Sequence, residues 1–208
     1  MFYFNIIATG LWQHFLHKVN RWDETLFLKI NRDWTNPFLD YNFPWWREAI
    51  TWVPLYFFLV LFVLMNFGKK AWLWIFFVIL TAAITDQASS VLFKEWVGRL
   101  RPCNDPFMIN YTRLLLSHCP SSQSFTSSHA TNHFGAAVFI YTTLKQYIKK
   151  WGYLLFFWAA TISYGQVYVG VHYPLDIVGG AILGSLIGYA MAQIFKRRVG
   201  GLEMIRIS

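Results

Sequence analysis

Three short polar clusters are the parts of this sequence that could carry out chemistry, because each lies at the end of a strongly apolar stretch. They are formed by residues 94–102, by residues 126–129, and by Gln166 with His172 and Asp176. Lysine and arginine bind phosphate oxygens through charge and N–H groups. Serine adds a hydroxyl donor, and histidine can attack phosphorus to form a covalent intermediate. We therefore expect phosphoryl-transfer chemistry at a membrane surface.

The first cluster contains two cations, Lys94 and Arg101, that are seven residues apart. They would share one face of a helix if the helix continued through both. Arginine would then bind an oxyanion through paired hydrogen bonds, and lysine would act as a point charge. Lysine and arginine also occur at the ends of membrane spans because their charges reach the polar interface. That structural role would explain the pair on its own.

The other two clusters contain two histidines that could act as an acid and a nucleophile, His129 and His172. Asp176 follows His172 by four residues, and a carboxylate at one imidazole nitrogen fixes the tautomer and stabilises the charged ring. Pro174 between them indicates a turn that opens a helix. Ser127 stands at the start of another apolar stretch, where free N–H groups of a helix N-terminus can point at an anion. Either histidine alone is explained equally well as a structural residue.

The composition predicts a membrane protein. Of the 208 residues, 56% are hydrophobic and 13% are charged, whereas a soluble domain carries about 25% charged residues. A helix needs about 20 residues to cross a bilayer. Five segments are apolar enough to cross: residues 50–67, 71–93, 129–144, 151–171 and 175–195. We predict an all-α integral membrane helical bundle with five transmembrane helices, or six if residues 2–16, which suit an N-terminal interfacial helix better, also cross.

The distribution of charge predicts the orientation. The net charge is +8, from 18 Lys and Arg against 10 Asp and Glu. The turns after the first and third predicted spans and the tail from residue 196 hold half of the basic residues and a single acid, so the positive-inside rule places them in the cytoplasm. All three polar clusters then face outward, which in a bacterial inner membrane means the periplasm. Because the basic residues lie at span ends and not on a solvated patch, we expect no nucleic-acid partner.

Three regions make up the predicted organisation. Residues 1–49 are an interfacial, amphipathic region whose tryptophans suit the headgroup level, either as a collar or as a lateral gate for lipid. Residues 50–195 are the transmembrane core, and residues 196–208 are a basic cytoplasmic tail.

A long loop over residues 95–126 joins the first two clusters, and loops of that length are usually functional or disordered. It contains both cysteines of the chain, Cys103 and Cys119. On an oxidising side of the membrane they predict a disulfide, which would hold the neighbouring Arg101 in place; two free thiols are the alternative.

Together, the clusters resemble the three motifs of the type 2 phosphatidic acid phosphatase (PAP2) family, which shares its pocket with vanadium haloperoxidases. In chain order the motifs are Lys94-x6-Arg101-Pro102, Ser127-Ser128-His129 and His172-x3-Asp176. The resemblance covers residues 50–195, and the order and spacing of three motifs are more specific than any one of them.

This resemblance implies a helical core and a reaction without metal or other cofactor on a phospholipid or polyprenyl phosphate in the bilayer. It implies that His172 is the nucleophile, that Asp176 orients it, and that His129 protonates the leaving group. It also implies that Lys94, Arg101 and Ser127 bind the phosphate.

The sequence departs from the family pattern at two positions. Ser128 stands where the family has a glycine whose backbone N–H approaches the phosphate, and a serine fits there if its backbone stays in an allowed region. Gln166 stands where the family has an arginine, six residues before His172. Glutamine can donate N–H bonds but brings no charge, and loss of a charge-assisted contact costs a few kcal/mol. We expect Ser128 and Gln166 still to contact the phosphate.

The sequence therefore predicts a membrane lipid phosphatase that acts through a phosphohistidine intermediate. Undecaprenyl diphosphate, lipid A 1-phosphate, phosphatidic acid and phosphatidylglycerol phosphate all fit an outward site, and we favour the first two. Transfer to another acceptor in place of water, and the oligomeric state, stay open.

Two other functions stay open. Gln166 favours a catalytically degenerate lipid-binding or scaffold protein. A metal-dependent membrane hydrolase is the other alternative. Its ligands would be His129, His133, His172 and Asp176. Asp86, the one acid inside a predicted span, is either a buried partner within the bundle or part of the site.

Overall fold

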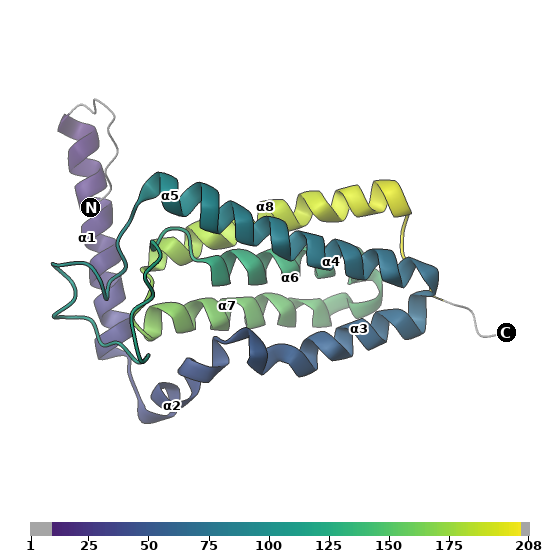
Figure 1. Cartoon of the computed structure of the whole chain (residues 1–208), viewed down its shortest axis with the longest axis horizontal. Coiled ribbons are helices and arrows are strands. Elements are labelled where there is room, and N and C mark those ends of the chain that lie inside the picture. Colours follow the sequence, from purple (N-terminus) through teal and green to yellow (C-terminus); the bar gives the residue numbers. More distant parts are fainter. Residues whose placement is uncertain (1–9, 205–208) are drawn as a thin grey trace.

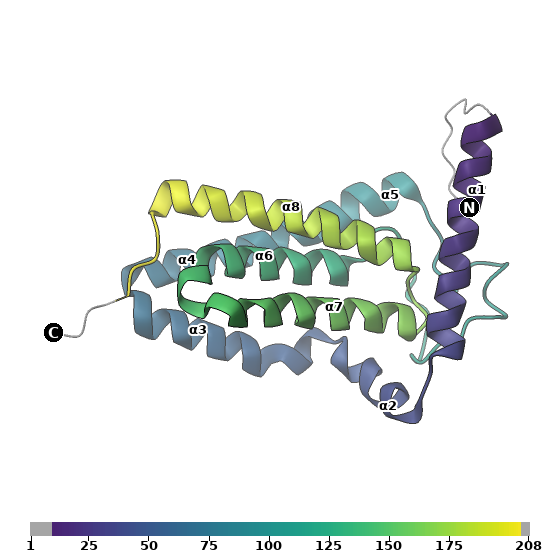
Figure 2. The same ribbon diagram turned by 180° about the vertical axis from the view of Figure 1, so that it is seen from behind.

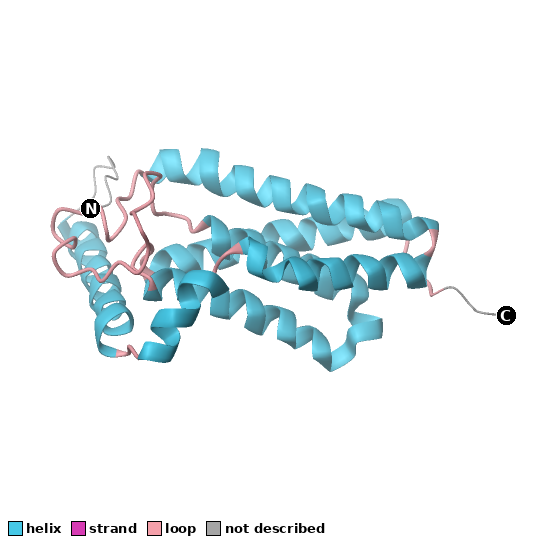
Figure 3. Cartoon of the chain, turned by 60° about the horizontal axis from the view of Figure 1, so that its bottom comes forward, coloured by secondary structure: helices cyan, strands magenta, loops and turns pink. Residues whose placement is uncertain are grey.

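The computed structural model describes residues 10–204, and every regular element in that range is a helix (Figures 1 and 3). The α-helices are α1 (Gly10–Leu28), α2 (Pro37–Trp46), α3 (Val53–Phe67), α4 (Lys69–Gln87), α5 (Lys94–Val97), α6 (Ser128–Ile148), α7 (Tyr153–Tyr168) and α8 (Pro174–Val199). A π-type segment, Ala88–Phe93, joins α4 to α5 without a break. The predicted all-α class is confirmed.

Five helices, α3, α4, α6, α7 and α8, run side by side in an elongated bundle (Figures 1 and 2). The central helix α6 packs against α8, α7 and α4. Glycines allow α6 and α8 to approach closely, since a Cβ on Gly184 would collide with the backbone of Thr131 and Gly135. The N-terminal ends of both helices therefore meet, and the Ser127 backbone N–H donates to the Asp176 carbonyl at 3.1 Å.

Three helical stretches are long and apolar enough to cross a membrane: Ala49–Phe67, Lys69–Val97 and Pro174–Val199. Only 11%, 17% and 28% of their most apolar windows are buried inside the protein. Apolar helices that face outward to this extent need lipid around them, because water would solvate them poorly. The protein is therefore an integral membrane protein. Helices α6 and α7 correspond to the other two predicted spans, and five crossings stay a prediction.

Helix α1 lies across one end of the bundle, whereas the C-terminal end of α8 lies at the other end (Figures 1 and 2). It begins at Gly10, so the first part of the predicted interfacial helix, residues 2–16, lies outside the described residues. Phe27 is buried against Tyr173, near the start of α8. This position across the end of the bundle suits the predicted level of the lipid headgroups, and the interfacial role of residues 1–49 stays a prediction.

The start of the predicted tail belongs to the bundle. Helix α8 continues to Val199, and Leu202 is buried, with its carbonyl accepting from Tyr147 Oη at 2.6 Å. Lys70 Nζ donates to the Gly201 carbonyl at 2.9 Å. Residues 205–208 lie outside the described residues.

The helix that carries Lys94 ends before it reaches Arg101. Gly98 adopts a left-handed conformation with φ of 62°, which ends a helix and favours glycine. Arg101 therefore lies in the loop and does not share a helix face with Lys94, contrary to the expectation for a continuous helix. In the same loop, Cys103 and Cys119 form a disulfide with a Cα–Cα distance of 5.8 Å.

Candidate active site

His172 and Asp176 form the buried centre of the site at the start of α8. Asp176 Oδ2 accepts from the Tyr173 backbone N–H at 2.8 Å and from Ser124 Oγ at 2.5 Å. His172 is 2% exposed, and its Nδ1 faces Asp176 Oδ2 at 3.4 Å. Its Nε2 lies 3.0 Å from Arg101 Nη1. Because arginine can only donate, Nε2 carries the lone pair and Nδ1 carries the proton of the neutral ring.

The surroundings keep the His172 ring neutral. Burial lowers the pKa of His172 to about 3, against the effect of Asp176, and the charge of Arg101 lowers it further. A neutral ring keeps Nε2 unprotonated, and its electron pair, which accepts from Arg101 here, is the pair that a nucleophile uses.

Arg99 connects this pair to helix α1. Its Nη1 lies 2.8 Å from Asp176 Oδ1, and its Nη2 lies 2.6 Å from Asp23 Oδ2. The guanidinium also stacks on the Tyr173 ring, 3.9 Å from the centroid. Burial alone would lower the pKa of Arg99, but the two carboxylates outweigh it and raise the pKa. Arg99 therefore stays charged and holds the second oxygen of Asp176. Sequence reasoning missed Arg99 and Asp23.

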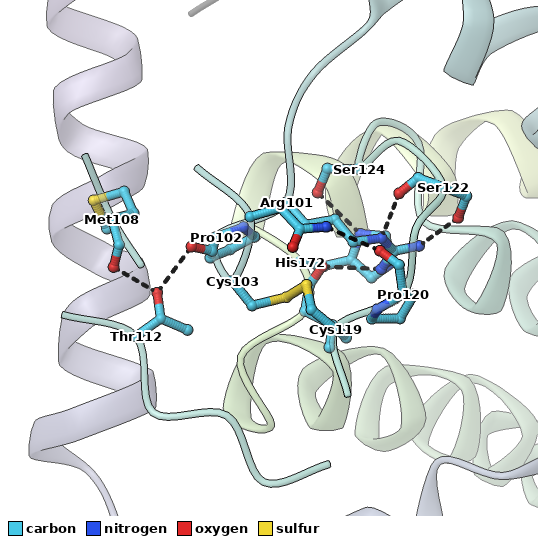
Figure 4. The surroundings of a disulfide bond; sticks show 12 residues. Arg101, Pro102, Cys103, Met108, Thr112, Cys119, Pro120, Ser122, Ser124 and His172 are labelled. Carbon is cyan, nitrogen blue, oxygen red and sulfur yellow. Dashed lines mark hydrogen bonds between the residues drawn. A yellow bond between two sulfur atoms is a disulfide. The ribbon is translucent and has the colours of Figure 1, made fainter. Parts of the chain in front are cut away.

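Arg101 is held beside His172 by the loop (Figure 4). Its Nε donates to the Ser122 carbonyl at 2.7 Å, and its Nη2 donates to Ser122 Oγ at 3.0 Å. Its Nη1 also donates to the Val171 carbonyl at 3.0 Å. The disulfide closes the chain segment between Arg101 and Ser122, as Figure 4 shows, so the loop fixes the position of this cation.

Lys94 is buried at the start of α5, and its charge acts on both Arg101 and His172. Asp86 lies earlier on the same continuous helix and accepts from Asn132 Nδ2 at 3.2 Å. Asp86 thus joins α4 to α6, and its charge also acts on Lys94, so both roles considered for it from the sequence stay open.

The serines of the second motif lie at the N-terminus of α6. Ser127 is fully buried and caps the helix, its Oγ accepting from the Ala130 N–H at 3.5 Å. Ser128 Oγ lies 3.1 Å from Ser89 Oγ in the segment before α5. The hydroxyls of the second motif therefore lie where the N–H groups of α6 begin.

His129 lies in the first turn of α6, close enough to His172 for the two rings to interact electrostatically. His133 follows one turn later, donates from Nδ1 to the His129 carbonyl at 2.7 Å, and packs edge-on against Trp158 at 4.8 Å. Within residues 10–204, no group of three His, Cys, Asp or Glu side chains could hold a metal ion. The ligand set of the metal alternative is therefore not brought together.

Gln166 lies on α7, fully buried, and the structure pairs it with a residue that sequence reasoning missed. Its Oε1 accepts from Arg47 Nε at 3.1 Å, and its Nε2 has no hydrogen-bond partner in the described part of the chain. Arg47 belongs to the connection between α2 and α3. The family has an arginine at the position of Gln166, so its absence could have prompted a search for another arginine. Local sequence patterns, however, do not indicate which arginine of the chain would take its place.

The fold and the site define a class of enzyme, the helical membrane phosphatases. Comparison with family models agrees: residues 70–199 match the PAP2 superfamily, and the chain belongs to it. The family resemblance seen in the sequence is confirmed, and with it an enzyme of the lipid phosphatase or diphosphatase type.

Individual relatives extend the match beyond the family core. A lipid A 4'-phosphatase from Bacteroides thetaiotaomicron is 34% identical over 81% of this chain and 75% of its own length. An undecaprenyl-diphosphatase from Sulfolobus acidocaldarius is 39% identical over 49% of this chain and 46% of its own. The crystal structure of a transmembrane PAP2 type phosphatidylglycerolphosphate phosphatase from Bacillus subtilis has the same fold, with a TM-score of 0.64, 23% identity and coverage of 87% of this chain and 88% of that one.

Proposed function

We propose that this protein removes a phosphate group from a lipid of the lipid A type, at the outer face of the membrane, through a phosphohistidine on His172. One observation carries the proposal: the buried, neutral His172 turns Nδ1 toward Asp176 and Nε2 toward Arg101. A ring fixed in this way presents its lone pair beside a cation that can hold the group under attack.

The reaction has two steps. In the first, His172 Nε2 forms a bond to phosphorus while the bond from phosphorus to the lipid oxygen breaks, and His129 donates a proton to that oxygen. The positive charge on the His172 ring is stabilised by Asp176. In the second step, water loses a proton to His129 and attacks phosphorus, the P–N bond breaks, and inorganic phosphate leaves.

Cations and helix N–H groups hold the phosphoryl oxygens during both steps. Lys94 and Arg101 supply charge, Ser127 supplies its hydroxyl, and Ser128 supplies hydroxyl and backbone donors at the start of α6. The charges of Lys94 and Arg101 act on His172, which supports this role for the two cations. No metal ion takes part in the proposed steps.

A lipid substrate also needs an apolar place for its chains beside the polar site. A groove of about 490 Å³ lies between the end of α2 and helices α3, α6 and α7. Trp46, the chain neighbour of Arg47, and Trp158, against which His133 packs, line it near the site. Its lining continues along the bundle to Trp151, in the turn just before α7. An acyl chain in this groove would lie within the bilayer while its headgroup stays at the interface.

The comparisons favour lipid A over a polyprenyl diphosphate. The lipid A 4'-phosphatase aligns over 81% of this chain, whereas the undecaprenyl-diphosphatase aligns over 49%. The relative's name points to the 4'-phosphate and not to the 1-phosphate expected from the sequence. The outward orientation is supported by the position of the site, at the end of the bundle opposite the basic C-terminal end of α8 (Figure 1).

Phosphate release by the purified protein in detergent tests the proposal. The substrates are lipid A, undecaprenyl diphosphate, phosphatidic acid and phosphatidylglycerol phosphate, each with and without EDTA. We expect release from lipid A that resists EDTA, disappears in His172→Ala and persists in His118→Ala, which changes an exposed loop histidine. Mass spectrometry of the lipid product identifies which phosphate has left.

Three results would contradict the proposal. Turnover by His172→Ala would exclude the phosphohistidine, and release that stops in EDTA would restore the metal-dependent alternative. A lack of release from every lipid would indicate a degenerate, lipid-binding protein.

A further inference from the structure

Arg47 is a buried cation whose charge is only partly balanced. Its side chain is 9% exposed, and its one carboxylate partner, Glu48 Oε1 at 2.7 Å, belongs to a side chain that is 45% exposed. By contrast, Arg99 lies between two fully buried carboxylates. Arg47 Nη2 has no hydrogen-bond partner among residues 10–204. A largely buried guanidinium with one donor still open favours an anion that completes its contacts.

The neighbour of Arg47 has an unused donor as well. Gln166 Oε1 accepts a hydrogen bond from Arg47, and Gln166 Nε2 is buried without a partner in the described chain. The backbone carbonyl of Gln166 accepts from the Val171 N–H at 3.1 Å, and the carbonyl of Val171 accepts from Arg101 at 3.0 Å. This short chain of contacts places Gln166 and Arg47 next to the turn that carries His172.

The charge of Arg47 also reaches the site. Burial lowers the pKa of Arg101 to about 10, Asp176 opposes that change, and Arg47 adds to it. Two guanidinium groups that repel each other in a buried space favour an anion between them. Neither has a fully buried carboxylate of its own among the hydrogen bonds that the described residues make.

We infer that Arg47 is a phosphate-binding residue, which Gln166 orients so that its guanidinium contacts the phosphoryl group bound at His172. The cation that the third motif lacks at position 166 is thus supplied from the connection between α2 and α3. This inference rests on the proposed function. The neighbour of Arg47, Trp46, lines the apolar groove, so one short segment contacts both the phosphate and the lipid chain.

Moving the charge between the two positions tests this inference. Arg47→Met removes the guanidinium, Gln166→Arg places one on α7, and the double variant has the cation on α7 alone. The readouts are kcat/KM on the lipid that the wild type hydrolyses and the inhibition constant of orthovanadate, a small phosphate analogue. Arg113→Met, which removes a guanidinium paired with Asp40 away from the site, is the matched control.

We expect Arg47→Met to lower kcat/KM by about 100-fold and to weaken orthovanadate inhibition, because one charge-assisted donor to the phosphoryl oxygens is lost. The double variant should regain at least about 10-fold of this loss, because Gln166→Arg restores the charge. Arg113→Met should keep the wild-type inhibition constant. If the role of Arg47 were purely structural, an arginine at position 166 on α7 would not restore activity to Arg47→Met.

Several results would overturn the inference. They are an unchanged inhibition constant in Arg47→Met, equal weakening in Arg113→Met, or a folded double variant that is no better than Arg47→Met. If Arg47→Met does not purify as a folded protein, Arg47→Gln, which removes the charge but keeps a polar side chain, replaces it, and unchanged orthovanadate inhibition then contradicts the inference. Failure of the proposed function itself is recognised separately, by a wild type without turnover or by an active His172→Ala.

Discussion

Two sides of the polar site differ in how completely their hydrogen bonds are made. Around His172, the carboxylate of Asp176 already has contacts from Arg99, Ser124 and the Tyr173 N–H. On the other side, Arg47 Nη2 and Gln166 Nε2 have no partner within the described chain. The first side is fixed before any ligand arrives, as a preorganised nucleophile requires. The second side has N–H donors that a ligand can use. Asp176 and its partners therefore orient the nucleophile, whereas Arg47 is proposed to bind the phosphate.

The largest expected effect on activity comes from removing the charge of Asp176, on the side of the site that is fixed by hydrogen bonds. Asp176→Asn keeps the shape but loses the charge that stabilises the phosphorylated His172 ring, so kcat should fall by about 10³- to 10⁴-fold. Steady-state kinetics on the wild-type substrate measure this, with Asp40→Asn as the control because Asp40 pairs with Arg113 away from the site. A kcat within about 10-fold of wild type would show that the ring needs no carboxylate.

A smaller effect on activity, but a large one on folding, is expected at Arg99. Arg99→Met leaves two buried carboxylates, Asp23 and Asp176, without a counter-charge, and should destabilise the protein by about 3–5 kcal/mol. Arg113→Met breaks a half-exposed ion pair and one hydrogen bond to the Asn31 carbonyl, and should cost about 1–2 kcal/mol. Thermal unfolding in the same detergent compares the two. Equal losses would mean that the buried triad does not stabilise this side of the site.

A third effect, spread over several pH units, concerns proton uptake by His172. Its pKa is about 3 in the folded protein, against about 6.5 in an unfolded chain. As the pH falls below about 6.5, the unfolded chain takes up the proton first, so stability is lost by at most about 1.4 kcal/mol per pH unit until the folded pKa is reached. Above that window the contribution is constant. Melting temperatures between pH 8 and pH 4 should therefore fall less steeply in His172→Gln than in the wild type, and parallel curves would contradict a neutral, buried His172.

Local patterns predicted the helices and the three motifs well. Apolar stretches of membrane length marked α3, α4 and α8, because lipid-facing helices are apolar on almost every side. The motif residues lie at helix ends, where capping and turn signals are strong, so Ser127 and Asp176 were found together with their helices.

The contacts missed from the sequence join residues that are far apart along the chain. Asp23 lies 76 residues from Arg99, and Arg47 lies 119 residues from Gln166. No periodicity links such partners, since they meet only after the helices pack. Gly98 could have predicted the end of the helix that carries Lys94, because a glycine in the left-handed conformation commonly ends a helix. It separates Arg101 from Lys94 and leaves Arg101 to the loop.

The disulfide gives the enzyme an order of assembly. Cys103 and Cys119 close the segment that sets Arg101 and Ser122 beside His172. Thiols pair on the oxidising side of a bacterial inner membrane and stay reduced in the cytosol. With the proposed outward orientation, a newly inserted chain has its helices in place before this loop is locked. The loop that holds Arg101 beside His172 would then be locked only after it has crossed the membrane.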